Sequence, residues 1–269
     1  SIGSLIGFNI FATRALGTIS SVQNSFSLIN KTNLYLKECK DFFRNSKNRF
    51  NGMQLSKVIG NLKLKNVSYS YNNDTRNKVN NFSANFNPSE ISVVSGKNGS
   101  GKTTISKLIT GLLTPESGEI LIDDTNLEKL SLLWYKNQVA YIPQDVDILN
   151  TSIFNNILIS NSELNEQEVS RLLQNVGLDE DLKNSDLTII DPIINNISKG
   201  ILKKIHIARS ISKTRQIYVF DDPTLYLDKK GCDMVIKLIA SLKRSGKTII
   251  CFSDDNEIIS LGDNRINME

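Results

Sequence analysis

Residues 90–103 read "EISVVSGKNGSGKT", a short β-rich run that enters a glycine loop ending in Lys102 and Thr103. Residues 96–103 complete the pattern G-x-x-x-x-G-K-T, and the helix-forming run "TTISKLITGLL" follows. Strand, loop and helix in this order predict a phosphate-binding loop, because the glycines let successive backbone N–H groups face one concavity and the helix N-terminus adds its positive dipole end. We expect Lys102 to reach the β- and γ-phosphates of a nucleotide and the Thr103 hydroxyl to ligate magnesium.

A pair of acids ends a second apolar run. In "QIYVFDDPTLYLD" (216–228) the residues Ile217–Phe220 lead directly into Asp221 and Asp222. Taken alone, such a pair can hold a metal, act as a base beside it or mark a solvated strand end. Next to a phosphate loop, an acid at the end of a neighbouring buried strand orders magnesium through water. We therefore expect Asp221 to serve the metal and Asp222 to polarise the attacking water.

The rest of the chain alternates strand and helix patterns. Residues 62–71, "LKLKNVSYSY", alternate apolar and polar side chains as a half-buried strand does. The near-continuous apolar runs in "QIYVFDD" and "TIICFSDD" are typical of parallel strands covered on both faces. Residues 72–86 predict a turn and a short strand, "GEILIDD" and "VAYIPQD" predict further strands, and helices are expected over 166–176, 199–213 and 231–244. This alternation predicts an α/β nucleotide-binding core.

The composition sets only general limits on the class of protein. The 269 residues are 39% hydrophobic and 22% charged, which is ordinary for a soluble domain, and the net charge of +4 is spread along the chain, so it does not argue for nucleic acid. Cys39, Cys232 and Cys251 have no spacing typical of a zinc site or a disulfide framework. We interpret them as reduced thiols.

The N-terminal residues predict a helix that leaves a membrane. Residues 1–12 carry no charged side chain, and Arg14 follows them. Twelve residues are too few to span a bilayer, and the basic residue follows the apolar stretch instead of preceding it as in a signal peptide. The simplest account is the end of a transmembrane helix with Arg14 near the cytoplasmic boundary; the alternative is an amphipathic packing helix. Helical spacing of apolar residues continues to about Phe43, and the polar residues 44–60 read as a linker.

Five segments in order resemble the nucleotide-binding domain of ATP-binding cassette (ABC) exporters. They are "NVSYSY" with Tyr71, "GKNGSGKTT", "YIPQD", "ISKGILKKIHIARSI" and "YVFDDPTLYLD". The upstream "SLIGFNIFATRALG" resembles the last membrane helix of type I secretion (peptide or protein) exporters. The resemblance implies a mixed-sheet P-loop core with a helical subdomain over 62–269, a linker over 44–61, and the helical end of a transmembrane domain over 1–43. It also implies ATP and Mg²⁺ as ligands, a second ABC subunit and a membrane domain as partners, no nucleic acid, and a place at the cytoplasmic face of the membrane.

The resemblance assigns roles residue by residue. Tyr71 would stack on adenine, and Gln144 would contact magnesium and the attacking water. Ser198 and Gly200 match the signature loop, which binds the γ-phosphate held by the opposite subunit, and Asp228 matches an aspartate at the dimer interface. The implied catalytic residues are Asp222, Gln144 and Asp254; the implied metal ligands are Thr103, Gln144 and Asp221; the implied nucleotide-binding residues are Tyr71, Gly96, Asn98, Gly99, Ser100, Gly101, Lys102, Thr103, Thr104, Ser198 and Gly200.

The departures from the family pattern concern hydrolysis. Lys199 and Ile201 replace a glycine and the glutamine of the signature, and Leu225 and Tyr226 replace a small Ser-Ala pair. Asp222 replaces a glutamate and is one methylene shorter, a misplacement that can cost roughly 10²-fold in rate. Asp254 replaces a histidine that donates to the γ-phosphate, whereas an ionised aspartate would repel it. His206 falls where the family has a small apolar residue, and we expect it to pack in the core.

The sequence therefore favours the ATP-binding domain of an ABC exporter with slow turnover. A second hypothesis is a regulatory or degenerate half of an asymmetric dimer, which binds ATP with little hydrolysis of its own. A third is a soluble ABC-type ATPase of DNA maintenance, but those carry long coiled coils where only about 95 residues separate Thr103 from Ser198 here, without heptads. The chain ends at "GDNRINME", where the family continues through another strand and helix, so we expect the fragment to be clipped at both ends.

Overall fold

The computed structural model describes residues 52–71, 78–183, 188–189, 197–268 and scattered positions between 2 and 36. The chain divides into two compact units, Ser1–Asn51 and Gly52–Glu269. In the first unit every described residue is helical, which confirms the helix prediction at those positions. None of the helices in the described part of the chain is long and apolar enough to cross a membrane. The transmembrane end therefore remains a prediction, and residues 37–51 lie outside the described residues.

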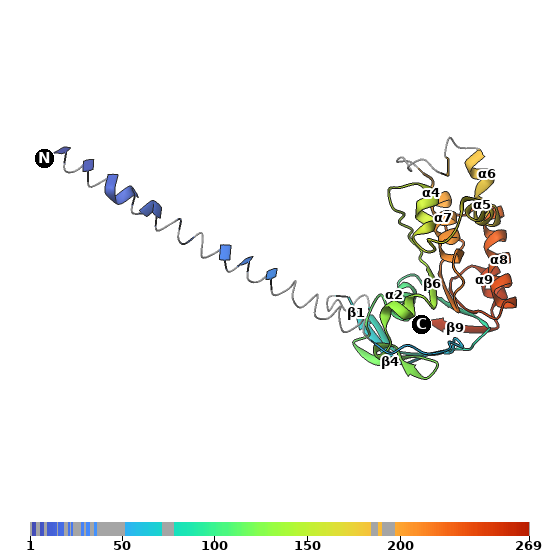
Figure 1. The fold of residues 1–269 in the computed structure, drawn as a ribbon. Coiled ribbons are helices and arrows are strands. Elements are labelled where there is room, and N and C mark those ends of the chain that lie inside the picture. Colours follow the sequence, from blue (N-terminus) through green and yellow to red (C-terminus); the bar gives the residue numbers. More distant parts are fainter. Residues whose placement is uncertain are drawn as a thin grey trace. The chain divides into compact units, whose positions relative to one another are not determined.

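The second unit contains two β-sheets (Figure 1). The first is antiparallel, with strand order β2-β1-β4-β5, and the second is parallel, with order β6-β7-β8-β3-β9. The strands are β1 (Leu62–Ser70), β2 (Lys78–Phe86), β3 (Ile91–Gly96), β4 (Ser117–Ile122), β5 (Thr125–Asn126), β6 (Val139–Ile142), β7 (Ile217–Asp221), β8 (Thr248–Phe252) and β9 (Asn264–Met268). A parallel sheet beside an antiparallel one confirms the predicted mixed-sheet core.

Four of the helices in the described part of this unit form a group of their own. Helices α4, α5, α6 and α7 contact one another and gather at one end of this unit, which matches the predicted helical subdomain (Figure 1). The helices are α2 (Lys102–Ile109), the 3₁₀ turn η1 (Leu127–Lys129), α3 (Leu132–Lys136), α4 (Ile153–Leu158), α5 (Glu166–Asn175), α6 (Leu178–Lys183), α7 (Lys199–Ile211), α8 (Lys229–Arg244) and α9 (Asn256–Leu261).

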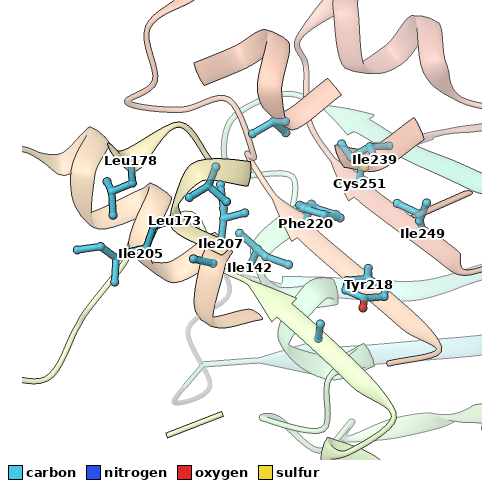
Figure 2. Close-up of a cluster of buried hydrophobic side chains, with 14 of the residues drawn as sticks. Ile142, Leu173, Leu178, Ile205, Ile207, Tyr218, Phe220, Ile239, Ile249 and Cys251 are labelled. Atoms are coloured by element: carbon cyan, nitrogen blue, oxygen red, sulfur yellow. The ribbon is translucent and has the colours of Figure 1, made fainter. Parts of the chain in front are cut away.

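Alternate residues of the parallel strands pack into two separate cores. On β7, Tyr218 and Phe220 face a cluster that includes residues of α5, α7 and α8 (Figure 2). Ile217 and Val219 of the same strand face a second cluster, which α2 and the antiparallel sheet complete. Successive side chains of a strand point to opposite faces, so the fully apolar run predicted from sequence reflects a sheet buried on both sides. Helix α2 is thereby fixed between the two sheets, with the phosphate loop at its N-terminus.

The sequence patterns located most of these elements and missed several. The predicted strands and helices all appear where the residues are described, with ends shifted by a few residues; 72–77, the predicted turn, lies outside the described residues. The short elements β5, η1, α3, α4, α6 and α9 were not predicted, nor was the strand β9. That strand pairs with β3 and places Met268 opposite Gly96, where the phosphate loop begins.

Residues 52–61 are attached to the antiparallel sheet. The backbone N–H groups of Ile59, Gly60 and Asn61 donate to the Asp123 carboxylate, with the shortest distances at 2.8 Å. Met53 pairs with Leu130 through a backbone bridge. The first half of the predicted linker lies outside the described residues, and the boundaries 1–43, 44–61 and 62–269 remain a prediction.

Candidate functional site

The glycine loop connects β3 to α2 as its sequence predicts. Gly99 and Gly101 have φ angles of 86° and 99°, in the left-handed region that favours glycine. Helix α2 begins at Lys102, and no side chain caps its first N–H groups. The Ser100 hydroxyl oxygen is buried and has no hydrogen-bond partner among the described residues. Free donors at a helix start and an orphaned hydroxyl in the loop suit an anion with several oxygens, such as a phosphate.

Lys102 lies almost buried within this loop, and its ammonium group has two hydrogen-bond partners there. Its ammonium group donates to the Gly96 carbonyl oxygen and to Asp254 Oδ2, which lies 2.7 Å from Nζ. The other Asp254 oxygen, Oδ1, accepts from the Gly96 N–H at 2.8 Å. Asp254 follows β8, so the end of one strand reaches across to the loop that follows its neighbour β3.

Three oxygen atoms from distant parts of the sequence meet beside the loop. Thr103 Oγ1 lies 3.3 Å from Asp221 Oδ1 and 3.5 Å from Gln144 Oε1. Thr103 comes from the first turn of α2, Asp221 from the end of β7, and Gln144 from the segment after β6. The carboxyl ends of parallel strands meet at one edge of the sheet, which is why these groups converge.

The Asp221 carboxylate is fully buried and heavily hydrogen-bonded. Its Oδ2 accepts from the Ser106 hydroxyl at 2.9 Å and from the Tyr141 hydroxyl at 3.2 Å. Burial raises the pKa of Asp221, and the hydrogen bonds from Ser106, Thr103 and Tyr141 partly offset that rise. A carboxylate held this firmly keeps its other oxygen, Oδ1, against the Thr103 hydroxyl.

Asp222 has a different environment from its neighbour. Its φ of 43° lies in the left-handed region, which aspartate tolerates better than most residues, and its N–H donates to the Phe252 carbonyl. Burial, followed by the charge of Asp221, raises the pKa of Asp222. Its side chain lines the cleft described next, whereas Asp221 lies behind it.

A cleft of about 360 Å³ opens over the loop. Tyr71 contributes an aromatic ring to this cleft from the residue after β1, and packs edge to face with Tyr69 at a centroid distance of 5.0 Å. The predicted site residues that line the cleft are Tyr71, Asn98, Gly99, Gly101, Lys102, Thr103, Thr104, Gln144 and Asp222. Gly96, Asp221 and Asp254 adjoin it through the contacts given above, and Ser100 lies in the loop between Gly99 and Gly101.

The residues present suit magnesium together with a nucleotide. Within the described ranges, no group of three or more His, Cys, Asp or Glu side chains is arranged to hold a metal by itself. Mg²⁺ is commonly bound by one or two carboxylates together with substrate phosphates and water, all oxygen ligands. Thr103, Gln144 and Asp221 offer that donor set beside the phosphate loop.

Ser198 and Gly200 lie in a separate pocket of about 510 Å³, which Lys199, Tyr226 and Asp228 also line. Ser198 caps α7 by accepting from the Ile201 N–H. A Cβ on Gly200 would lie 2.9 Å from the Tyr226 carbonyl oxygen, so only glycine fits this approach. Lys199 Nζ lies 3.2 Å from the Tyr226 hydroxyl and 4.4 Å from its ring centroid. Two residues that depart from the family pattern therefore contact each other.

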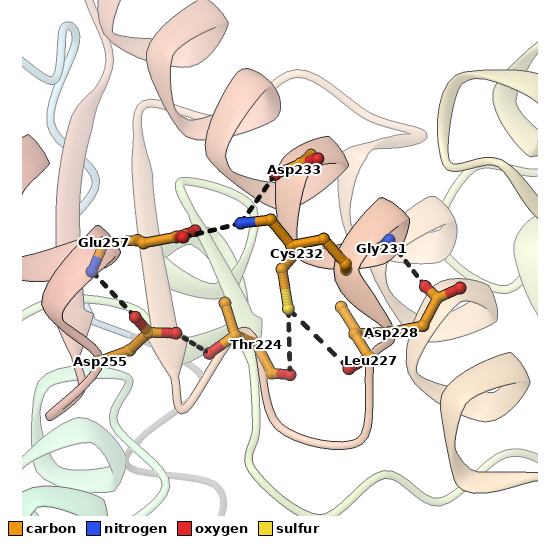
Figure 3. Close-up of polar contacts among 9 residues, drawn as sticks. Thr224, Leu227, Asp228, Gly231, Cys232, Asp233, Asp255 and Glu257 are labelled. Atoms are coloured by element: carbon orange, nitrogen blue, oxygen red, sulfur yellow. Dashed lines mark hydrogen bonds and ion pairs between the residues drawn. The ribbon is translucent and has the colours of Figure 1, made fainter.

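The loop after Asp222 is tied to the ends of α8 and α9 (Figure 3). The Thr224 hydroxyl donates to Asp255 at 2.8 Å, and Asp228 caps α8 by accepting from the Gly231 N–H at 2.8 Å. The Cys232 thiol approaches the carbonyl oxygens of Thr224 and Leu227 at 3.9 Å each. These contacts fix the loop that carries Tyr226.

His206 and the two cysteines among the described residues do not line the cleft. His206 is buried in α7 with Nδ1 3.3 Å from the Ser210 hydroxyl, and burial lowers its pKa to about 3, which confirms the packing interpretation. Cys232 and Cys251 are free thiols, as predicted, and burial raises the pKa of both. Cys39 lies outside the described residues.

Two residues outside the predicted set, Ser106 and Lys203, support the predicted site residues. Ser106 lies three residues after Thr103, one turn along α2. Residues with this spacing share a helix face, so the sequence indicates that the Ser106 hydroxyl can also reach Asp221. Lys203 gave no such signal. Its buried ammonium donates to the carbonyl oxygens of Pro143 at 2.7 Å and Asp222 at 3.2 Å, and so joins α7 to the segments that carry Gln144 and Asp222.

Lys203 makes stability depend on pH in the alkaline range. Burial lowers its pKa to about 8, an effect that the charges of Asp221, Asp222 and Asp145 partly oppose. Between about pH 8 and the unfolded value of about 10.4, the unfolded chain binds more protons, so the free energy of unfolding should rise with pH. We expect this rise, about 1–3 kcal/mol, in urea denaturation of the wild type but not of Lys203→Met. Equal pH slopes in the two proteins would show that Lys203 titrates normally.

Two sheets, a phosphate loop and a helical subdomain in this arrangement define an ABC-type nucleotide-binding domain. The family model for the ABC transporter matches residues 79–225, more than half of the chain, and the chain belongs to this family. The family assignment implies that the domain binds ATP.

Among individual proteins, the chain is similar to the alpha-hemolysin translocation ATP-binding protein HlyB of Escherichia coli O6:H1 (strain CFT073), at 26% identity over 273 residues. It is 25% identical over 273 residues to the leukotoxin translocation ATP-binding protein LktB of a Pasteurella haemolytica-like species (strain 5943B). Both matches cover 100% of this chain and 38% of the relative, so the chain spans about two fifths of their length. A bacterial Atm1-family ABC exporter solved with ATP bound shares the fold, with a TM-score of 0.73 at 21% identity over 81% of this chain and 38% of that one.

Proposed function

We propose that this chain binds Mg·ATP in the cleft over residues 96–104 and serves as the ATP-binding component of an exporter. The observation that carries the proposal is the convergence of Thr103 Oγ1 with Asp221 and Gln144, within 3.5 Å, beside Lys102. A phosphate loop alone indicates anion binding. A hydroxyl, a buried carboxylate and an amide oxygen next to it add the donor set that would hold Mg²⁺ beside the phosphates.

Each residue has a distinct task in this proposal. Lys102 and the first N–H groups of α2 neutralise phosphate charge, and Tyr71 stacks on the base. Thr103, Gln144 and Asp221 hold Mg²⁺, which when bound neutralises charge on the β- and γ-phosphates. Asp222 lines the cleft and orients the attacking water, and Gln144 contacts both that water and the metal.

The same residues favour slow hydrolysis. Asp222 has a short side chain on a backbone held at a φ of 43°, and Asp254 brings negative charge to the Lys102 ammonium. Lys199 binds Tyr226 in the pocket of Ser198 and Gly200, which lies apart from the cleft. We propose that this second pocket serves the nucleotide of a second ABC subunit, so that two domains enclose two nucleotides.

We further propose that the energy drives export across a membrane, through a membrane domain coupled to this one at the cytoplasmic face. The two relatives described above are named for translocation of alpha-hemolysin and of leukotoxin, which favours an exporter of the type I secretion class. The apolar residues between 1 and 12 support a membrane connection through the N-terminal unit.

A second candidate function is an ATP-binding regulatory half of an asymmetric dimer. The Lys102–Asp254 contact favours it, because the lysine needed for phosphate is already paired. Measurement of ATP hydrolysis and ATP affinity on the same sample separates the two functions. Turnover that saturates with ATP, alone or with a partner subunit, supports the exporter ATPase; tight binding without turnover in both settings supports the regulatory half.

The dependence of ATP affinity on Mg²⁺ tests the proposal. We expect Mg²⁺ to raise the ATP affinity of the wild type by at least about tenfold and this gain to disappear in Asp221→Asn, because the amide keeps the shape but loses the charge that attracts the cation. Titration calorimetry with ATP in Mg²⁺ or in EDTA measures both. Asp145→Asn, a change of an exposed acid near Gln144, is the control and should keep the gain. An Asp221→Asn variant that responds to Mg²⁺ like the wild type would contradict the proposed metal site.

A further inference from the structure

Asp254 makes the contacts that a phosphate group would make. Its two oxygens accept from the Gly96 N–H at 2.8 Å and from Lys102 Nζ at 2.7 Å. A backbone N–H and the loop lysine are the donors that a phosphate loop offers to its ligand. The Asp254 side chain is half exposed while that of Lys102 is 9% exposed, so the carboxylate reaches the buried lysine from the solvent side.

The opposite end of β3 carries the same arrangement without a phosphate loop. Asp263 accepts from the N–H of Ile91, the first residue of β3, and from Lys243 of α8. Asp254 accepts from Gly96, the last residue of β3. Both aspartates thus bind a strand-end N–H and a lysine, and only one of them lies at the glycine loop. Asp263 therefore provides a matched control for the effect of Asp254 on ligand affinity.

We propose that Asp254 is an internal anion that competes with nucleotide phosphates for Lys102 and the Gly96 N–H, and so sets the nucleotide affinity of this site. This inference rests on the nucleotide binding proposed above. The Gly96 N–H has one hydrogen to donate, and a carboxylate and a phosphate that contact the same ammonium repel each other. We therefore expect nucleotide binding to turn the Asp254 side chain away from Lys102, and its half-exposed position gives it solvent to turn into.

The competing carboxylate keeps its charge at neutral pH. Partial burial raises the pKa of Asp254, but the hydrogen bonds from Lys102 and Gly96 and the charge of Lys102 outweigh it and lower the pKa overall. Lys102 and the Gly96 N–H contact the carboxylate, and Asp222 is an acid near enough for the charge of Asp254 to raise its pKa. Competition should persist across the physiological range.

The experiment measures affinity for ATP, ADP and inorganic tripolyphosphate by titration calorimetry with the full chain. In Asp254→Asn the amide oxygen keeps one acceptor for Gly96 but no longer holds the ammonium. We expect affinity to rise about 10- to 100-fold, the fold-change equivalent of one hydrogen bond to a charged group, and to rise alike for ATP and tripolyphosphate. Asp254→Glu keeps the charge, so it should not show the gain expected for Asp254→Asn. Asp263→Asn controls for loss of a lysine contact, and Asp255→Asn controls for loss of a nearby charge.

The outcomes separate this inference from the function on which it rests. A gain confined to Asp254→Asn supports the competition. Equal affinity in the wild type and Asp254→Asn, weaker binding in the variant, or the same gain in Asp255→Asn overturns it while leaving nucleotide binding intact. Failure of every variant and the wild type to bind nucleotide overturns the proposed function and the inference with it. If Asp254→Asn does not fold, Asp254→Ser provides the same comparison.

Discussion

Lys102→Ala is expected to lower the affinity for Mg·ATP at least about 100-fold and to abolish ATP-dependent activity. The lysine supplies charge-assisted hydrogen bonds to phosphate, each worth about 1.5–3 kcal/mol, and two of them account for a loss of that size. The loop itself should survive, because Gly99 and Gly101 set its shape and α2 packs between the two sheets independently of this ammonium. Titration calorimetry or displacement of a fluorescent nucleotide measures the effect.

A matched control comes from the lysine at the other end of β3. Lys243→Ala removes an ammonium that likewise pairs with an aspartate, but far from the cleft lining, and its ATP affinity should equal that of the wild type. If Lys102→Ala binds Mg·ATP as tightly as the parent, the phosphate loop is not the nucleotide site.

Replacing two acids together should raise the rate of hydrolysis. In Asp222→Glu with Asp254→His, the longer carboxylate reaches toward the attacking water and the histidine donates where the aspartate repels. A misplaced group costs roughly 10²-fold, so we expect a gain of up to that size in kcat. The glutamate must adopt the left-handed φ of Asp222, which costs some stability because aspartate tolerates that region better. A steady-state ATPase assay on a sample of verified oligomeric state measures the gain.

The single variants divide the gain between its two causes. Asp254→His frees Lys102 and should act on nucleotide affinity and on kcat, whereas Asp222→Glu should act on kcat with little change in affinity. Should the double variant hydrolyse ATP no faster than the parent, the slow step lies elsewhere, and the Lys199–Tyr226 contact becomes the next candidate.

The parts of the site that sequence predicted are those fixed by local chain geometry. The loop before Lys102 is a contiguous motif, and the apolar run before Asp221 marks a buried strand whose end must reach the same sheet edge. Asp221, Thr103 and Gln144 therefore converge as expected. The near-continuous apolar sequences of β7 and β8 likewise predicted a sheet covered on both faces.

The missed parts depend on pairings between distant segments. Lys203 supports Pro143 and Asp222 from a helix with no motif of its own, and its contact partners are carbonyl oxygens that every residue possesses. The Asp254–Lys102 pair joins residues 152 positions apart, and only the parallel pairing of β3 with β8 brings them together. The strand β9 is short and polar on alternate residues, so its sequence does not show that it pairs with β3.

The central claim is that residues 96–104 hold the phosphates of a nucleotide. A structure of the full chain with Mg²⁺ and a non-hydrolysable ATP analogue tests it most directly. The account predicts phosphates against the Lys102 ammonium and the first N–H groups of α2, the metal beside Thr103 and Asp221, and the Asp254 carboxylate turned away from Lys102. Phosphates bound in another pocket, or bound while Lys102 still holds Asp254, would contradict it.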